Sequence, residues 1–152
     1  RRSSDLTTKH GYALDSFYVF IPEHAGDNYR DLISYIEFEL GKRINEKTPI
    51  EPPLTGRLSR QLKHFPLPPE VNIRLDDKQN YYVMSIIAGD RPGLLSRITR
   101  VLAANQISIY SAKISTLGER AEDTFLINGS VLHEQKSMVK LESDLLAELR
   151  AS

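Results

Sequence analysis

The chain has 152 residues, in which 20 Lys and Arg balance 20 Asp and Glu, and it contains no cysteine. This balance argues against nucleic acid or an anionic membrane as the main partner, because neither strongly attracts a near-neutral chain. The lack of cysteine excludes disulfides, thiolate metal sites and cysteine nucleophiles, and it fits a reducing, cytoplasmic setting. No apolar run approaches the roughly 18 residues that span a bilayer, and the first residues lack the apolar core of a signal peptide.

Residues 1–48 repeat a pattern found near the end of the chain. The identical pairs at an offset of 108 positions are Thr8/Thr116, Ala13/Ala121, Asp15/Asp123 and Phe17/Phe125. At an offset of 105, Ile33, Ile36, Leu40 and Ile44 correspond to Met138, Leu141, Leu145 and Leu149. Residues 1–48 therefore predict the strand, strand and helix of the second half of a repeated module. Because half a module leaves apolar faces uncovered, we expect a homodimer, strand exchange or an upstream partner domain.

Residues 49–69 are rich in proline, holding six of the eight prolines of the chain. Proline disfavours both helix and internal strand, so this segment is predicted to be a semi-stiff linker. It also carries the basic side chains of Arg57, Arg60, Lys63 and His64. These indicate either a docking strip for an acidic surface or a solvated linker, and the balanced charge of the whole chain favours the linker.

Residues 70–152 alternate between the periodicities of strand and helix. Residues 71–75 alternate apolar and polar like an edge strand, and residues 81–88 are apolar on both faces like a central strand. Apolar residues at helical spacing then predict a helix over 94–102. Residues 107–114 and 121–127 predict two strands, joined by a turn at Leu117-Gly118-Glu119-Arg120.

The last predicted element is a helix with one apolar stripe. The stripe consists of Met138, Leu141, Leu145 and Leu149, and Val139 and Leu146 are predicted to back it. The resulting order of strand, helix, strand, strand and helix predicts an α+β fold. We expect a ferredoxin-like α/β plait, in which both helices cover one face of an antiparallel sheet. The chain would then hold one complete module, over 70–152, and the second half of a preceding one.

A candidate ligand site lies where the predicted central strand meets the following helix. In Gly89-Asp90-Arg91-Pro92-Gly93-Leu94-Leu95, Asp90 is predicted to cap the helix, and Pro92 is tolerated in a first helical turn. Gly93 allows a ligand to approach the free N–H groups closely, so the carboxylate of an amino acid fits this position. An ordinary capped helix start explains the same residues.

Asp15 and Asp123 each occupy the middle of a predicted strand, on its apolar face. A carboxylate there needs a partner, because burying it unpaired is costly. Two interpretations stay open: contact with the ammonium group of a ligand, or a structural pair with an Arg or Lys, such as Arg120 or Lys113.

The sequence offers no catalytic constellation. Its four histidines, His10, His24, His64 and His133, are scattered, so we expect no metal site. No nucleophile, base and oxyanion site can be assembled from its motifs. His10-Gly11-Tyr12-Ala13 begins like the aromatic motif of RNA-recognition modules, but Leu14-Asp15-Ser16 follows where bases would stack. We therefore expect neither catalysis nor nucleic-acid binding from these residues.

Two segments of residues 70–152 carry a family resemblance. The motif Asp90-Arg91-Pro92-Gly93-Leu94-Leu95 and residues 111–123 together resemble the last ACT domain of the bifunctional uridylyltransferase/uridylyl-removing enzymes that act on the PII signal protein. Residues 11–17 are similar to the second half of the preceding ACT domain of that family, and residues 60–65 to the linker between the two. The resemblance covers nearly the whole chain.

The resemblance implies a regulatory part rather than a catalytic one. Tandem ACT domains in that family sense glutamine and set the balance between adding and removing uridylyl groups in nitrogen metabolism. It implies an effector loop formed by Asp90, Arg91, Pro92, Gly93, Leu94 and Leu95, with Ser111 and Lys113 as second-line contacts. Mg²⁺ would belong to upstream catalytic domains, whose motifs this sequence lacks. An ACT-type assembly module without a small-molecule ligand is the alternative.

Overall fold

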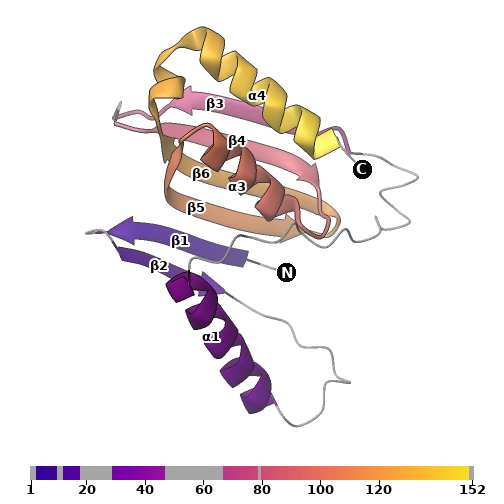
Figure 1. Ribbon diagram of the computed structural model, residues 1–152. Coiled ribbons are helices and arrows are strands. Elements are labelled where there is room, and N and C mark those ends of the chain that lie inside the picture. Colours follow the sequence, from indigo (N-terminus) through magenta and orange to yellow (C-terminus); the bar gives the residue numbers. More distant parts are fainter. Residues whose placement is uncertain (1–2, 10–11, 18–28, 47–66, 79, 151–152) are drawn as a thin grey trace. The chain divides into compact units, whose positions relative to one another are not determined.

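The protein is described from a computed structural model that places residues 3–9, 12–17, 29–46, 67–78 and 80–150 (Figure 1). Most of the predicted linker, including its four basic side chains, lies outside these described residues, as do His10, Gly11 and His24. The chain divides into two units, one formed by Arg1–Tyr18 with Pro53–Ser152 and the other by Val19–Pro52.

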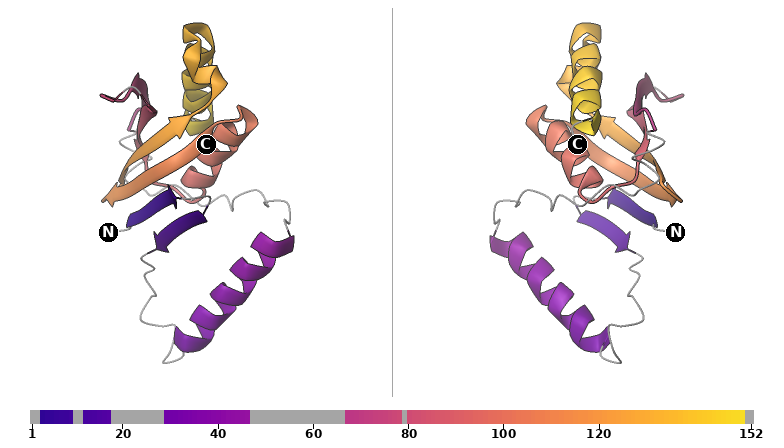
Figure 2. Two further views of the ribbon diagram at one scale, coloured as in Figure 1. Left: turned by 90° about the vertical axis from the view of Figure 1, so that its left-hand side faces the viewer. Right: turned by 90° about the vertical axis from the view of Figure 1, so that its right-hand side faces the viewer.

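The first unit is built on an antiparallel sheet. Its elements are β1 (Ser3–Lys9), β2 (Tyr12–Phe17), β3 (Glu70–Leu75), β4 (Tyr82–Gly89), α3 (Leu94–Ala104), β5 (Ser108–Leu117), β6 (Arg120–Asn128), the 3₁₀ helix η2 (Ser130–His133) and α4 (Gln135–Arg150). Among the described residues the strand order is β2-β1-β5-β6-β4-β3, and every neighbouring pair is antiparallel. Helices α3 and α4 cover one face of the four strands from β5 to β3 (Figures 1 and 2). The predicted α+β plait is confirmed.

Each strand of the complete module lies where its sequence pattern predicts. β4 is central, between β6 and β3, and its alternate residues Met84, Ile86 and Ala88 are buried. β3 is the edge strand, with Ile73 as its one buried side chain. The turn between β5 and β6 has Gly118 at φ 62°, a left-handed conformation that glycine adopts without strain. An alternating apolar and polar pattern thus predicted the edge strand, and a run of residues apolar on both faces predicted the central strand.

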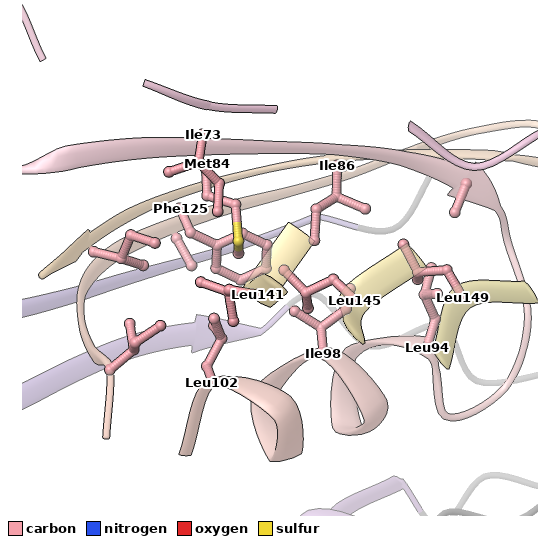
Figure 3. Close-up of a cluster of buried hydrophobic side chains, with 14 of the residues drawn as sticks. Ile73, Met84, Ile86, Leu94, Ile98, Leu102, Phe125, Leu141, Leu145 and Leu149 are labelled. Carbon is pink, nitrogen blue, oxygen red and sulfur yellow. The ribbon is translucent and has the colours of Figure 1, made fainter. Parts of the chain in front are cut away.

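The core fills the space between the sheet and the two helices (Figure 3). Its fully buried large side chains are Met84, Ile86, Ile98, Leu102, Phe125, Ile127, Leu132, Leu141 and Leu145. Three of the four predicted stripe residues of α4 are buried, and Met138 packs against the same cluster. The prediction was wrong for Val139, whose side chain is 56% exposed. Each residue turns a helix by about 100°. Because Met138 packs against the core, the next residue, Val139, points away from it.

The β1–β2 hairpin has the same strand register as the β5–β6 hairpin. Thr8 faces Ala13 and Thr116 faces Ala121, which are equivalent pairs at the offset of 108. β1 also pairs with β5, its own counterpart, and the pairing is centred on Asp5 facing Lys113. These two residues are themselves equivalent in the repeat. The two hairpins are therefore joined through matching strands in a locally two-fold register.

The second unit contains helix α1, Tyr29–Glu46, which has no buried residue. Its apolar stripe corresponds to that of α4 in sequence, but Ile33, Ile36, Leu40 and Ile44 are all exposed. An amphipathic helix is normally stabilised by burying such a stripe. In the part of the chain that the structure describes, this stripe is uncovered.

Candidate functional site

A cavity of about 280 Å³ lies between the β4–α3 loop and the neighbouring ends of β5 and β6. The residues that line it are Asp90, Arg91, Pro92, Gly93, Leu94, Leu95, Ser96, Ile114, Thr116, Ala121 and Asp123. The structure thus brings the six residues of the predicted effector loop to one cavity. That they bind a ligand stays a prediction.

The start of α3 differs from its predicted form. Gly93, at φ 80°, occupies the N-cap position, and no side chain caps the helix. The predicted cap by Asp90 is wrong, because the helix begins at Leu94 and Asp90 lies too far before it. Instead, the Asp90 N–H donates to the Glu119 carbonyl at 2.8 Å. This bond ties the loop to the β5–β6 turn.

The first turn of α3 has N–H groups available to a ligand. The Leu94 N–H donates to the Arg91 carbonyl at 3.2 Å, and the Arg97 N–H donates to the Gly93 carbonyl at 3.0 Å. Within the described residues, the N–H groups of Leu95 and Ser96 have no acceptor. Unpaired donors at the positive end of a helix dipole favour an anion. This end of the cavity therefore suits a carboxylate.

Arg91 connects the loop to the end of α4. Its Nη2 donates to the Glu148 carbonyl at 3.2 Å and also to the Leu149 carbonyl. The last carbonyls of a helix lack partners within the helix, and a cation there also complements the helix dipole. Burial, together with the nearby Arg97, lowers the pKa of Arg91, while Glu148 opposes that effect. Arg91 thus fixes the position of the loop on α4.

Among the described residues, Asp123 is the one charged residue that is buried, with 3% of its surface exposed. Its Oδ1 accepts the Ser115 N–H at 3.3 Å. Burial raises the pKa of Asp123 to about 6, and Asp90 adds to that effect, against the opposing effect of the Ser115 N–H. Two carboxylates therefore lie within electrostatic reach of each other in the cavity wall.

The structure contradicts one of the two interpretations of Asp123. Arg120, one proposed partner, has its Nε 2.6 Å from Glu122 Oε1 instead. Lys113, the other, is exposed and forms no ion pair with Asp123 in the described chain. Asp15, which corresponds to Asp123 in the repeat, is exposed. The two aspartates differ because Asp123 lies on β6, between β5 and β4 and on the buried face of the sheet, whereas β2 has β1 as its one neighbour in the described sheet.

Ser111 and Lys113 do not line the cavity, although the family resemblance implied contacts from their strand. Ile114 and Thr116, from the same strand, line it instead. Successive side chains of a strand point to opposite faces, so Lys113 lies on the face away from Ile114. Thr116 is identical to Thr8 at the equivalent position of the repeat. The repeat thus singled out this residue in the sequence but did not indicate that it lines a cavity.

Neither a metal centre nor a membrane-spanning helix is found among the described residues. Within them, no group of three or more His, Cys, Asp or Glu side chains is arranged to hold a metal ion. None of the described helices combines the length and the apolar character needed to cross a membrane.

Comparison with known proteins identifies the fold and places the cavity within it. Residues 82–136, from β4 to the start of α4, match the ACT domain family. The chain therefore contains an ACT domain, and the cavity lies at the loop between β4 and the first helix of that domain. No solved structure matches the chain.

Over almost its whole length, the chain is similar to one region of larger enzymes. It is 53% identical over 144 residues to the bifunctional uridylyltransferase/uridylyl-removing enzyme of Chromobacterium violaceum, a match that covers 95% of the chain and 17% of that enzyme. It is 49% identical to the enzyme of the same name from Cupriavidus pinatubonensis, over 94% of the chain and 17% of the enzyme. The enzyme of the same name from Aromatoleum aromaticum is 50% identical, and that match covers 94% of the chain and 16% of the enzyme. The chain thus contains an ACT domain over residues 82–136 and spans about a sixth of the length of these enzymes.

Proposed function

We propose that the chain is an amino-acid-sensing regulatory region of a bifunctional uridylyltransferase/uridylyl-removing enzyme, with glutamine as its effector. Glutamine would bind in the cavity at the β4–α3 loop. Binding would shift attached catalytic domains toward removing uridylyl groups from the PII signal protein. The chain itself would contribute no catalytic group.

The observation that carries this proposal is the polarity of the cavity. The start of α3 offers the N–H groups of Leu95 and Ser96, and two acidic residues, Asp90 and Asp123, line the same cavity. A free amino acid carries one charge of each sign, so its two charged groups match this arrangement. The remaining wall is largely apolar, as in most small-molecule sites.

Regulation follows if glutamine binds one arrangement of the protein more tightly than another. A ligand shifts an equilibrium only by its differential affinity for the two states. The loop is attached to the end of α4 through Arg91 and to the β5–β6 turn through Asp90. A ligand that orders the loop therefore acts on two other elements of the domain.

Calorimetric titration with glutamine and glutamate tests the proposal. We expect glutamine to bind the chain and glutamate to bind more weakly, because Asp90 and Asp123 repel a second negative charge. In the full-length enzyme, glutamine should raise the ratio of uridylyl removal to uridylyl transfer. Equal affinity for the two amino acids, or no binding of glutamine, would contradict the proposed effector.

An ACT-type assembly module without a ligand is the second candidate. It is favoured by the exposed apolar stripe of α1 and by the pairing of β1 with β5. Exposed apolar patches often mark protein interfaces. Thermal unfolding with a panel of amino acids separates the candidates: a ligand raises the melting temperature by mass action, whereas an assembly module responds to protein concentration.

A further inference from the structure

Asp123 is nearly fully buried but reaches the cavity wall. Within the described residues its hydrogen bond is the one from the Ser115 N–H, and no Lys or Arg there lies within ion-pair distance of it. A buried carboxylate is costly unless a cation or several hydrogen bonds compensate it. One backbone N–H at 3.3 Å compensates it only in part.

The second charged group of the wall increases the need for a cation. Asp90 acts electrostatically on Asp123, and both line the same cavity. Since the pKa of Asp123 is about 6, its carboxyl group is ionised at neutral pH. Arg91 also lines the cavity, but its Nη2 donates to the Glu148 and Leu149 carbonyls, and within the described residues it forms no ion pair with Asp123. A positively charged group of a bound molecule would supply the missing charge.

We propose that Asp123 is the residue that binds the α-ammonium group of the amino-acid effector. This inference rests on the proposed function and assigns a role that the loop motif does not contain, because Asp123 lies on β6, outside the loop. The ammonium would contact Asp123 on β6, while the α-carboxylate would face the start of α3. The two ends of the effector would thus join two elements of the ACT domain.

The ligand side of the test removes the ammonium group. Glutaramic acid is glutamine without its amino group, so it keeps the carboxylate and the amide. Because a hydrogen bond to a charged group contributes roughly 1.5 to 3 kcal/mol, we expect the wild-type chain to bind glutamine about 10 to 150 times more tightly than glutaramic acid. Calorimetry at pH 7.5 measures both dissociation constants.

The protein side of the test is Asp123→Asn, which keeps the size of the side chain and an acceptor for the Ser115 N–H. We expect this variant to lose most of the preference for glutamine, so that the two ligands bind with similar affinity. Glu122→Gln is the matched control, since Glu122 is the neighbouring carboxylate on β6 and does not line the cavity. It should retain the full preference.

The outcomes separate the two proposals. If the wild-type chain binds both ligands equally, or if Asp123→Asn weakens both by the same factor, Asp123 does not bind the ammonium group and the glutamine site itself stands. If another amino acid binds in place of glutamine, Asp123→Asn should abolish its preference over the analogue without the amino group, and an unchanged preference would overturn the inference. If no amino acid binds, the proposed function fails and this inference fails with it.

Discussion

At the scale of single residues, Asp123 shows how burial changes the chemistry of a carboxyl group. Its sequence neighbour Glu122 is solvent-accessible and pairs with Arg120, whereas Asp123 faces the core side of the sheet. The alternation of a strand is sufficient to separate them. One position along the strand therefore decides between a surface ion pair and a buried carboxyl group with a raised pKa.

The raised pKa predicts that Asp123 destabilises the ligand-free protein at neutral pH. Its pKa rises from 3.8 to about 6 on folding, so the folded state binds the proton more tightly than the unfolded state. The stabilising effect of that proton is fully present below pH 3.8 and is lost as the pH rises through 6. Because a tenfold difference in proton affinity corresponds to about 1.36 kcal/mol, the loss amounts to at most about 3 kcal/mol.

Chemical denaturation of the wild type and of Asp123→Asn at pH 4 and pH 7.5 measures this effect. The variant should be similar to the wild type at pH 4 and clearly more stable at pH 7.5. Asp90 is the charged group that faces Asp123 from the β4–α3 loop, and it is unchanged in both proteins. Glu122→Gln, by contrast, should follow the wild type at both pH values within about 1 kcal/mol, since exposed ion pairs contribute little. A constant difference across the pH range would refute the assignment.

At the scale of elements, the β4–α3 loop is held from two directions. Asp90 binds the β5–β6 turn through its backbone, and Arg91 binds the end of α4 through its side chain. The sequence pattern of the loop is that of a helix cap with a ligand site. In the structure the cap position belongs to Gly93, and the arginine of the motif binds α4.

Arg91→Ala is expected to destabilise the ACT domain. The substitution removes the donors that satisfy the Glu148 and Leu149 carbonyls, and such helix-end interactions contribute about 1 to 2 kcal/mol. It should also weaken effector binding, because the hydrogen bonds of Arg91 no longer hold the β4–α3 loop against the end of α4. Thermal unfolding and calorimetry measure the two effects. Arg100→Ala, which removes an exposed arginine of α3, is the control and should change neither. If Arg91→Ala behaves like Arg100→Ala, the bond to α4 does not stabilise the domain.

Much of the domain could be predicted from the sequence, because period two and period 3.6 report directly on burial. The strands over 71–75 and 81–88, and the helix stripe of Leu141, Leu145 and Leu149, lie in the structure as expected. The loop motif also led to the cavity. What periodicity does not reveal is which groups pair across the fold, since that depends on distances between elements. The bond from Arg91 to α4, and the lack of a cation beside Asp123 in the described chain, are of this kind.

At the scale of the whole molecule, the repeat explains how the two hairpins associate. β1 and β5 are equivalent strands, and their pairing is centred on Asp5 facing Lys113. If β5 of a second copy of the chain took the place of β1 in the same register, Lys113 of one copy would face Lys113 of the other. Opposite charges in facing positions of antiparallel strands are favourable, and like charges are unfavourable. The register therefore favours the pairing of different hairpins over the pairing of identical ones.

Charge reversal tests this selection in a double-mutant cycle. Asp5→Lys or Lys113→Asp alone places like charges in facing positions, and the two together restore an opposite pair in the reverse order. We expect a coupling of about 0.2 to 1 kcal/mol, measured as hydrogen-exchange protection of the β1 amides in the four chains. The control cycle uses Asp15→Lys with Lys113→Asp, because Asp15 lies on β2 and does not face β5. It should show no coupling. Equal coupling in both cycles would show that net charge, and not the facing register, determines how β1 binds β5.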